Sequence, residues 1–101
     1  MQIRALIVVF LTLLGASCAG PAPYEEYTYA RTALDAARSS GAAKYAPGLW
    51  FKADEAYRKG AKAYKDRYFK EARDYLINAR KYAEKAENST RLKKFESGDG
   101  F

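Results

Sequence analysis

Five tyrosines follow one another at helical spacing and could support binding chemistry. They stand in steps of seven, four, seven and seven residues, at Tyr57, Tyr64, Tyr68, Tyr75 and Tyr82. On helices, residues spaced in this way form edges beside the alanine face, where their rings could stack on sugars or on another helix. The structural alternative is that the rings cover gaps beside a core of small residues while each hydroxyl reaches water. The pattern favours this alternative, and both interpretations are compatible if the rings are half exposed.

Basic residues crowd the same part of the chain. Between Lys52 and Lys94 lie 14 basic and seven acidic residues, and Lys62, Lys65 and Arg67 fall among the tyrosines. This surplus favours acidic partners such as anionic lipid headgroups or acidic envelope polymers. Cations interleaved with aromatic rings can also bind single-stranded nucleic acid. Because the leader described below predicts export, nucleic acid is not an expected partner.

Catalytic, metal and cofactor chemistry is not predicted. The chain has no histidine and one cysteine, so it lacks the usual near-neutral acid–base group and a thiolate zinc site. Asp54, Glu55, Glu71 and Asp74 fall on polar helix surfaces, where nothing would make one of them an acid and another a base. Neither a glycine-rich phosphate loop nor a nucleophile elbow is present in the sequence. We therefore expect a protein that is not an enzyme and needs no metal or cofactor.

Three amphipathic helices would have to position these side chains. Small and apolar residues recur every three or four positions in three stretches, each of which defines one helical face. The first stretch covers residues 24–40, with Tyr27, Ala30, Leu34, Ala37 and Gly41 on the face. The second begins at Leu49 and places Leu49, Ala53, Ala56, Gly60 and Ala63 together. The third carries Phe69, Ala72, Leu76, Ala79, Ala83 and Ala86.

The segments between the helices contain recognisable boundary signals. Gly41 suits a C-terminal cap, and Pro47 suits the first turn of the next helix. A turn near residues 66–68 would reverse the chain; without it, the second and third helices would form one rod. A lone rod would leave both apolar faces exposed, so the hairpin is favoured. The predicted fold is all-α, a helical hairpin or small three-helix bundle, with fraying from Asn88 onward and a flexible tail at residues 95–101.

The N-terminal segment has the layout of a secretory signal. Arg4 precedes an apolar block that ends at Leu14, and small residues follow. The block is shorter than the roughly 20 residues of a membrane-spanning helix, so export followed by cleavage is favoured. We divide the chain into a signal peptide at 1–17, a cysteine with a short tether at 18–23, a helical domain at 24–94 and the tail.

Cys18 follows this apolar block directly. Ala16, Ser17 and Cys18 resemble the lipobox of bacterial lipoproteins, although Gly15 stands where that pattern usually has leucine. The resemblance implies that Cys18 is lipidated, for example with palmitate, and becomes the mature N-terminus. In that family, aspartate immediately after the cysteine marks retention in the inner membrane. Residue 19 is alanine, so the resemblance implies the outer membrane, on its periplasmic face. The alternative is an ordinary signal peptide cut near residue 19 or 20.

The helical part is similar to a family of small Gram-negative envelope lipoproteins and OmpA-associated proteins that share an uncharacterised alanine-rich helical domain. The matching residues are Ala33, Leu34, Ala36, Ala37, Tyr45, Ala46, Pro47, Ala53, Ala56, Tyr68, Ala72 and Ala79. A weaker resemblance links Gly60, Ala72, Leu76 and Ala79 to the packing positions of a single tetratricopeptide hairpin. The first resemblance implies a cell-envelope location.

These observations together predict a lipid-anchored envelope protein with a structural or adaptor role. Its basic, tyrosine-lined helical face would bind a protein partner, a second copy or an acidic envelope component. The alternative is a soluble periplasmic module that binds a polysaccharide or another polyanion through its tyrosines and lysines.

Overall fold

Helices make up most of the chain in a computed structural model, which describes residues 2–15 and 21–98, without the side chains of residues 11–15. They are α1 (Gln2–Gly15), α2 (Tyr24–Ser40), α3 (Ala42–Tyr45), α4 (Pro47–Lys65) and α5 (Phe69–Ser97). Neither described range contains a strand, and the predicted all-α class is confirmed. None of the helices in these ranges has the length and apolar character needed to cross a membrane.

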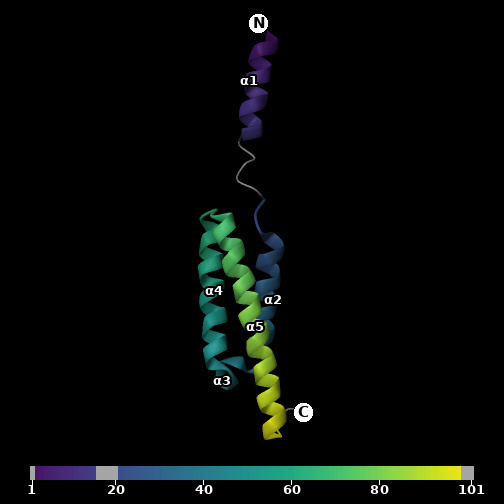
Figure 1. Cartoon of the computed structure of the whole chain (residues 1–101), viewed down its shortest axis with the longest axis vertical. Coiled ribbons are helices and arrows are strands. Elements are labelled where there is room, and N and C mark those ends of the chain that lie inside the picture. Colours follow the sequence, from purple (N-terminus) through teal and green to yellow (C-terminus); the bar gives the residue numbers. More distant parts are fainter. Residues whose placement is uncertain (1, 16–20, 99–101) are drawn as a thin grey trace.

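The three long helices α2, α4 and α5 lie side by side (Figure 1). The α4–α5 turn lies at the same end as the start of α2, and the short helix α3 closes the opposite end. The described chain measures 79 × 20 × 14 Å, and its radius of gyration of 20.4 Å exceeds the roughly 13 Å of a compact chain of this length. This elongation includes α1, which stands apart from the other helices in Figure 1. From here on, the helical domain means residues 21–98, which extend beyond the predicted range of 24–94 at both ends.

Alanine forms most of the core of the helical domain. One cluster joins α2, α3, α4 and α5 through Leu34, Ala37, Ala42, Ala46, Ala53, Ala83 and Ala86. A second cluster lies nearer the α4–α5 turn and contains Ala30, Ala72, Leu76 and Ala79. The predicted apolar faces are thus the ones that meet. Because alanine offers little area to bury, the core is thin for a domain of this size.

Gly60 marks the closest approach of α4 to α5. A Cβ atom at this position would lie 2.9 Å from Cγ and Cδ2 of Leu76 and 3.2 Å from Cβ of Tyr75. These separations are shorter than ordinary carbon–carbon contacts, so the absence of a side chain lets the two helices pack. By contrast, a Cβ at Gly48 in the first turn of α4 would meet nothing within 4 Å.

The chain between α2 and α4 follows the predicted boundaries and adds one helical turn. Gly41 caps α2 in the left-handed conformation, with φ +94°, and Pro47 occupies the first turn of α4. The single turn α3 lies between them and buries Ala42. A four-residue helix is too short to produce a readable period, which explains why the sequence pattern does not indicate it.

A turn at residues 66–68 separates α4 from α5 without glycine or proline. The N–H groups of Arg67 and Tyr68 donate to the carbonyls of Tyr64 and Ala63, at 3.1 and 2.8 Å. These bonds form a Schellman motif, which requires a left-handed residue at the position of Arg67. Arg67 adopts φ 66°, a conformation that costs a non-glycine residue about 1 kcal/mol. Backbone bonding thus stops α4 despite an unfavourable residue type.

The prediction of fraying from Asn88 onward is wrong for the described part of that segment, because α5 continues to Ser97. Thr90 extends the buried stripe, and its hydroxyl donates to the carbonyl of Ala86 at 2.7 Å, so its polar group is satisfied within the helix. The ammonium groups of Lys93 and Lys94 donate to the carbonyls of Tyr45 and Ser40, which tie this part of α5 to α3 and α2. Residues 99–101 of the predicted tail lie outside the described residues.

Candidate functional site

The five tyrosines predicted to line one face occupy three different environments. Tyr57 and Tyr64 are half-buried beside α2, whereas Tyr68 and Tyr75 are exposed near the α4–α5 turn. Tyr82 is half-buried, and the ammonium groups of Lys52 and Lys85 lie 5.6 and 5.9 Å from the centre of its ring. The series therefore divides among Tyr57 and Tyr64 on α4, Tyr68 in the turn, and Tyr75 and Tyr82 on α5.

Tyr57 and Tyr64 form an aromatic cluster with Tyr27 of α2. The ring of Tyr27 lies 5.8 Å from that of Tyr57 and 5.0 Å from that of Tyr64, at tilted angles. The ring of Phe69 lies 5.9 Å from Tyr64, edge to face. Such pairs stabilise a fold beyond their area burial. These two predicted site residues therefore have a packing role that joins α2 to the α4–α5 hairpin.

The hydroxyl of Tyr57 donates to the hydroxyl of Tyr27 at 3.4 Å. Burial and this hydrogen bond raise the pKa of Tyr57 from 10.0 to about 12. The phenol is consequently protonated at neutral pH. Its surroundings suit packing, and they move its pKa away from the range in which a general acid or base operates.

Tyr68 and Tyr75 are brought together with lysines in a groove across α4 and α5. The groove is lined by Lys59, Lys62, Ala63, Asp66, Tyr68, Glu71 and Tyr75. Lys59 is engaged by Glu55 at 2.9 Å, which raises the pKa of its ammonium group. Lys62 makes no ion pair with any residue of the described ranges. The groove thus offers one uncommitted cation beside two exposed phenol rings.

A second groove lies between α2 and α4 at the same end of the helical domain. Its lining residues are Tyr24, Tyr27, Ala61, Lys62, Tyr64 and Lys65. Lys62 borders both grooves, so basic and aromatic side chains lie on two sides of the end of α4. Tyr24 and Tyr27 were not among the predicted site residues; Tyr27 does, however, belong to the predicted apolar face of residues 24–40.

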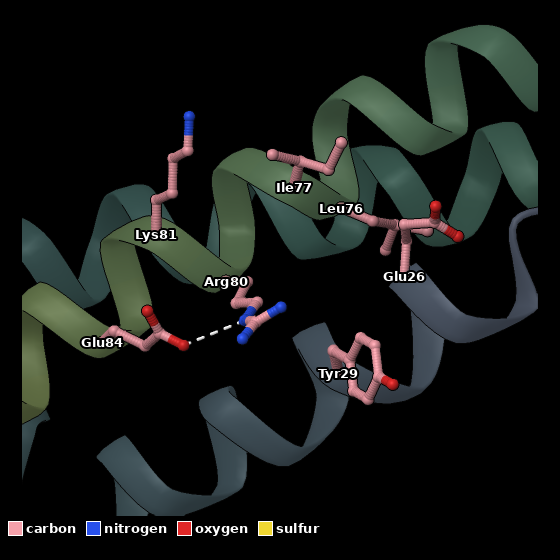
Figure 2. A pocket seen from close by; sticks show the side chains of 7 residues that line it. All are labelled: Glu26, Tyr29, Leu76, Ile77, Arg80, Lys81 and Glu84. Carbon is pink, nitrogen blue, oxygen red and sulfur yellow. Dashed lines mark hydrogen bonds and ion pairs between the residues drawn. The ribbon is translucent and has the colours of Figure 1, made fainter.

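A further hollow of about 240 Å³ lies between α2 and α5, lined by Glu26, Tyr29, Leu76, Ile77, Arg80, Lys81 and Glu84 (Figure 2). The guanidinium of Arg80 lies 5.1 Å from the ring centre of Tyr29 and donates to Glu84 at 2.9 Å. Lys81 points away from the hollow in Figure 2. Arg80 in this hollow therefore already has a carboxylate and a ring as partners.

Among the helical carboxylates Asp54, Glu55, Glu71 and Asp74, the first is partly buried and the other three are exposed. Asp54 pairs with Arg58 and Glu55 with Lys59, both at 2.9 Å and one turn apart. Glu71 and Asp74 are exposed on α5. Within residues 2–15 and 21–98, no group of three metal-ligating side chains comes together. The expectation that the protein is not an enzyme stays a prediction.

Cys18, the predicted lipid attachment site, lies outside the described residues. Upstream of it, α1 exposes apolar side chains on several sides, with Ile3 at 72%, Leu6 at 67% and Phe10 at 65% of their full accessible area. No other residue of the described chain buries this apolar surface, which would be unfavourable in water.

Comparison with known proteins identifies one family. A family model described as "Domain of unknown function (DUF4398)" matches residues 25–97, which includes all of α3, α4 and α5 and nearly all of α2. No curated protein and no solved structure matches the chain.

Proposed function

The chain belongs to the DUF4398 family, and we propose that it is a lipid-anchored cell-envelope protein with a structural or adaptor role. The observation that carries this proposal is the order of segments at the N-terminus. An apolar helix of 14 residues, α1, is followed by Ala16, Ser17 and Cys18 and then by the helical domain. Cleavage before Cys18 would remove the exposed apolar surface of α1 and leave a cysteine that acyl chains can modify.

A lipid on Cys18 would provide a durable anchor, because each buried methylene contributes about 0.8 kcal/mol to membrane binding and several chains act together. The expected location is the outer membrane on its periplasmic side. From the anchored end, α5 would project about 44 Å, given 29 residues at about 1.5 Å each. A rod of this length suits a protein that holds a partner at a distance from the membrane.

Mass spectrometry of the protein isolated from its envelope tests the anchor. We expect the N-terminal peptide to begin at Cys18 and to carry acyl mass. A peptide that begins at Ala19 or later without acyl mass would contradict the proposal. Cys18→Ser should leave the protein unacylated. The variant should then either appear in the soluble fraction or keep its uncleaved signal peptide. Gly15→Leu is a matched variant that should speed processing, since it supplies the usual lipobox leucine.

The projecting end of α5 supports contact with a protein partner. Leu92 and Phe95 expose 58% and 64% of their accessible area there, and both border a groove with Ala36 and Ser39 of α2. A photo-crosslinking residue at Leu92 should form a specific adduct in the native envelope, whereas the same residue at exposed Thr28 on α2 serves as the control. Equal adducts at both positions would contradict a partner site at this end.

A second candidate function, a polysaccharide- or polyanion-binding module, is favoured by the groove that joins Lys62 to Tyr68 and Tyr75. Aromatic faces and cations together suit sugar rings with acidic groups. Titration with an acidic polysaccharide should then give a saturable shift that Tyr68→Ala with Tyr75→Ala abolishes. The absence of a saturable shift in that titration would contradict the polyanion-binding function.

A further inference from the structure

We propose that the end of the helical domain at the α4–α5 turn is a membrane-facing surface that binds anionic lipid headgroups through Lys62, Lys65, Arg67 and Lys70. We call these four residues the turn-end cluster. The inference rests on the proposed lipid anchor and deepens it, because it assigns an orientation and a headgroup chemistry to the anchored protein.

The first argument is that none of these cations has a carboxylate, carbonyl or ring partner in the described structure. Elsewhere in the helical domain most basic side chains have carboxylate, carbonyl or ring partners; Arg58, Arg73 and Arg91 are examples. None of the ion pairs, side-chain hydrogen bonds or cation–ring contacts found in residues 2–15 and 21–98 uses a member of the turn-end cluster. All four are exposed, and Asp66 is the single acidic residue in the segment 61–70.

The second argument is that two members occupy positions where their residue type opposes folding. Arg67 has φ 66°, where glycine would be more stable. Lys70 lies in the first turn of α5, where the positive end of the helix dipole repels a cation. Stability therefore does not explain either residue. Residues that break a local rule without a structural gain are expected at functional surfaces.

The third argument is position relative to the anchor. Figure 1 shows the α4–α5 turn at the same end as the start of α2, and Tyr24 shares a groove with Lys62 and Lys65. Cys18 precedes Tyr24 by six residues, a backbone span of at most about 20 Å. A lipid on Cys18 would hold this end, and not the α3 end, beside the membrane.

Aromatic side chains complete the surface. Tyr24 and Tyr68 expose 69% and 63% of their accessible area at this end. Tyrosine is favoured at the membrane–water boundary, since its ring is apolar and its hydroxyl remains hydrated. The combination of free cations and exposed tyrosines beside an acyl anchor fits a surface of anionic phospholipid better than it fits a neutral one.

Lysine footprinting on the full, membrane-isolated chain tests this proposal. The protein is reconstituted on vesicles of phosphatidylcholine alone or mixed with phosphatidylglycerol, and the rate of amine labelling at each lysine is measured by mass spectrometry. We expect labelling of Lys62, Lys65 and Lys70 to fall about fivefold on the anionic vesicles, as the interaction of each cation near such a surface implies. Added salt should reverse the protection, because it screens the headgroup charge.

Lys81 is the matched internal control. It also lacks an ion pair within the described residues, but it lies on α5 away from the turn. Its labelling should be equal on both vesicles. Lys62→Gln with Lys65→Gln should reduce protection of Lys70, whereas Lys81→Gln should not. Equal labelling of the cluster on both vesicles, or equal protection of Lys81, would overturn the proposal.

Two further outcomes separate headgroup binding from polymer binding and from the proposed lipid anchor. Protection of the cluster by a soluble acidic polysaccharide, with none on anionic vesicles, would assign the surface to a polymer and overturn headgroup binding. The acyl mass at Cys18, measured on the same sample, reports on the anchor independently. An acylated chain without protection refutes the headgroup surface alone, whereas protection of an unacylated chain refutes the anchor alone.

Discussion

The two ends of the helical domain both carry cations, yet they use them differently. At the α3 end, the ammonium groups of Lys93 and Lys94 donate to the carbonyls of Tyr45 and Ser40, and Lys94 also lies 5.3 Å from the ring centre of Tyr45. At the turn end, the cluster defined above has no such partners among the described residues.

The difference arises from which helix ends lie within reach of lysine side chains. Helix α4 finishes in a Schellman motif, in which backbone N–H groups donate to the carbonyls of Ala63 and Tyr64. Helix α2 also has a backbone cap at Gly41, but the carbonyls of Ser40 and Tyr45, at the ends of α2 and α3, accept in addition from lysines of α5. Carbonyls in the last turn of a helix lack intrahelical donors, so side chains can bond to them. The comparison teaches that a basic residue's role here depends on whether a helix-end carbonyl lies within its reach.

The largest expected change in stability separates the two glycines of α4, Gly60 near the turn end and Gly48 near the α3 end. Gly60→Val should destabilise the protein by about 3 kcal/mol, because the added atoms would overlap Leu76 and Tyr75. Gly48→Val makes the same change in the same helix, at a position with open space, and should alter stability by less than about 0.5 kcal/mol. Urea unfolding followed by circular dichroism gives both values.

A double variant sharpens this test. Combined with Leu76→Ala, which empties the space that the new side chain would enter, Gly60→Val should cost clearly less than it does alone. An unchanged cost would mean that close approach to Leu76 is not the cause.

A smaller effect is expected from lysines at the two ends. Lys94→Met keeps most of the side-chain volume but removes the donor to Ser40, and it should lower the free energy of unfolding by about 2 kcal/mol. Lys70→Met at the turn end should be neutral or slightly stabilising, because it removes a cation from the start of α5. Parallel unfolding measurements compare the two, and a similar loss for both variants would erase the proposed difference between the ends.

The smallest effect concerns the two left-handed residues, Gly41 at the α3 end and Arg67 at the turn end. Gly41→Ala should destabilise the protein by about 1 kcal/mol, since alanine is strained at φ +94°. Arg67→Gly should stabilise it by about the same amount, since it removes that strain at φ 66°. Thermal unfolding checks the opposite signs, and Arg67→Lys, which keeps both charge and strain, should leave the melting temperature unchanged.

Sequence reasoning located the core because a period of three to four residues is a local property of each helix. The buried alanines of α5, from Ala72 to Ala86, are the residues that the period selects. Thr90 was missed because its type is polar, although its hydroxyl bonds within the helix and allows burial. The end of α5 was missed for a related reason: its anchoring lysines bond to carbonyls about 50 residues earlier in the chain, a contact that no local pattern records.

The candidate surface was predicted less completely than the core. Lys62, Lys65 and Arg67 were selected because they cluster near the predicted turn, where they do lie. The sequence could not separate Tyr57 and Tyr64 from Tyr68 and Tyr75. That division depends on the position of α2, which brings Tyr27 against the first two rings and leaves the last two in water.

The sequence by itself determined the helical class, the apolar faces, the caps at Gly41 and Pro47, and the prediction of an anchor at Cys18. Each of these depends on residues that are close together in the chain. The tertiary structure decided which cations are committed to carbonyls and which are free, because that depends on which helix ends lie within reach of a side chain. It also decided that the start of α2 and the α4–α5 turn share one end of the domain, which gives the free cations a common surface.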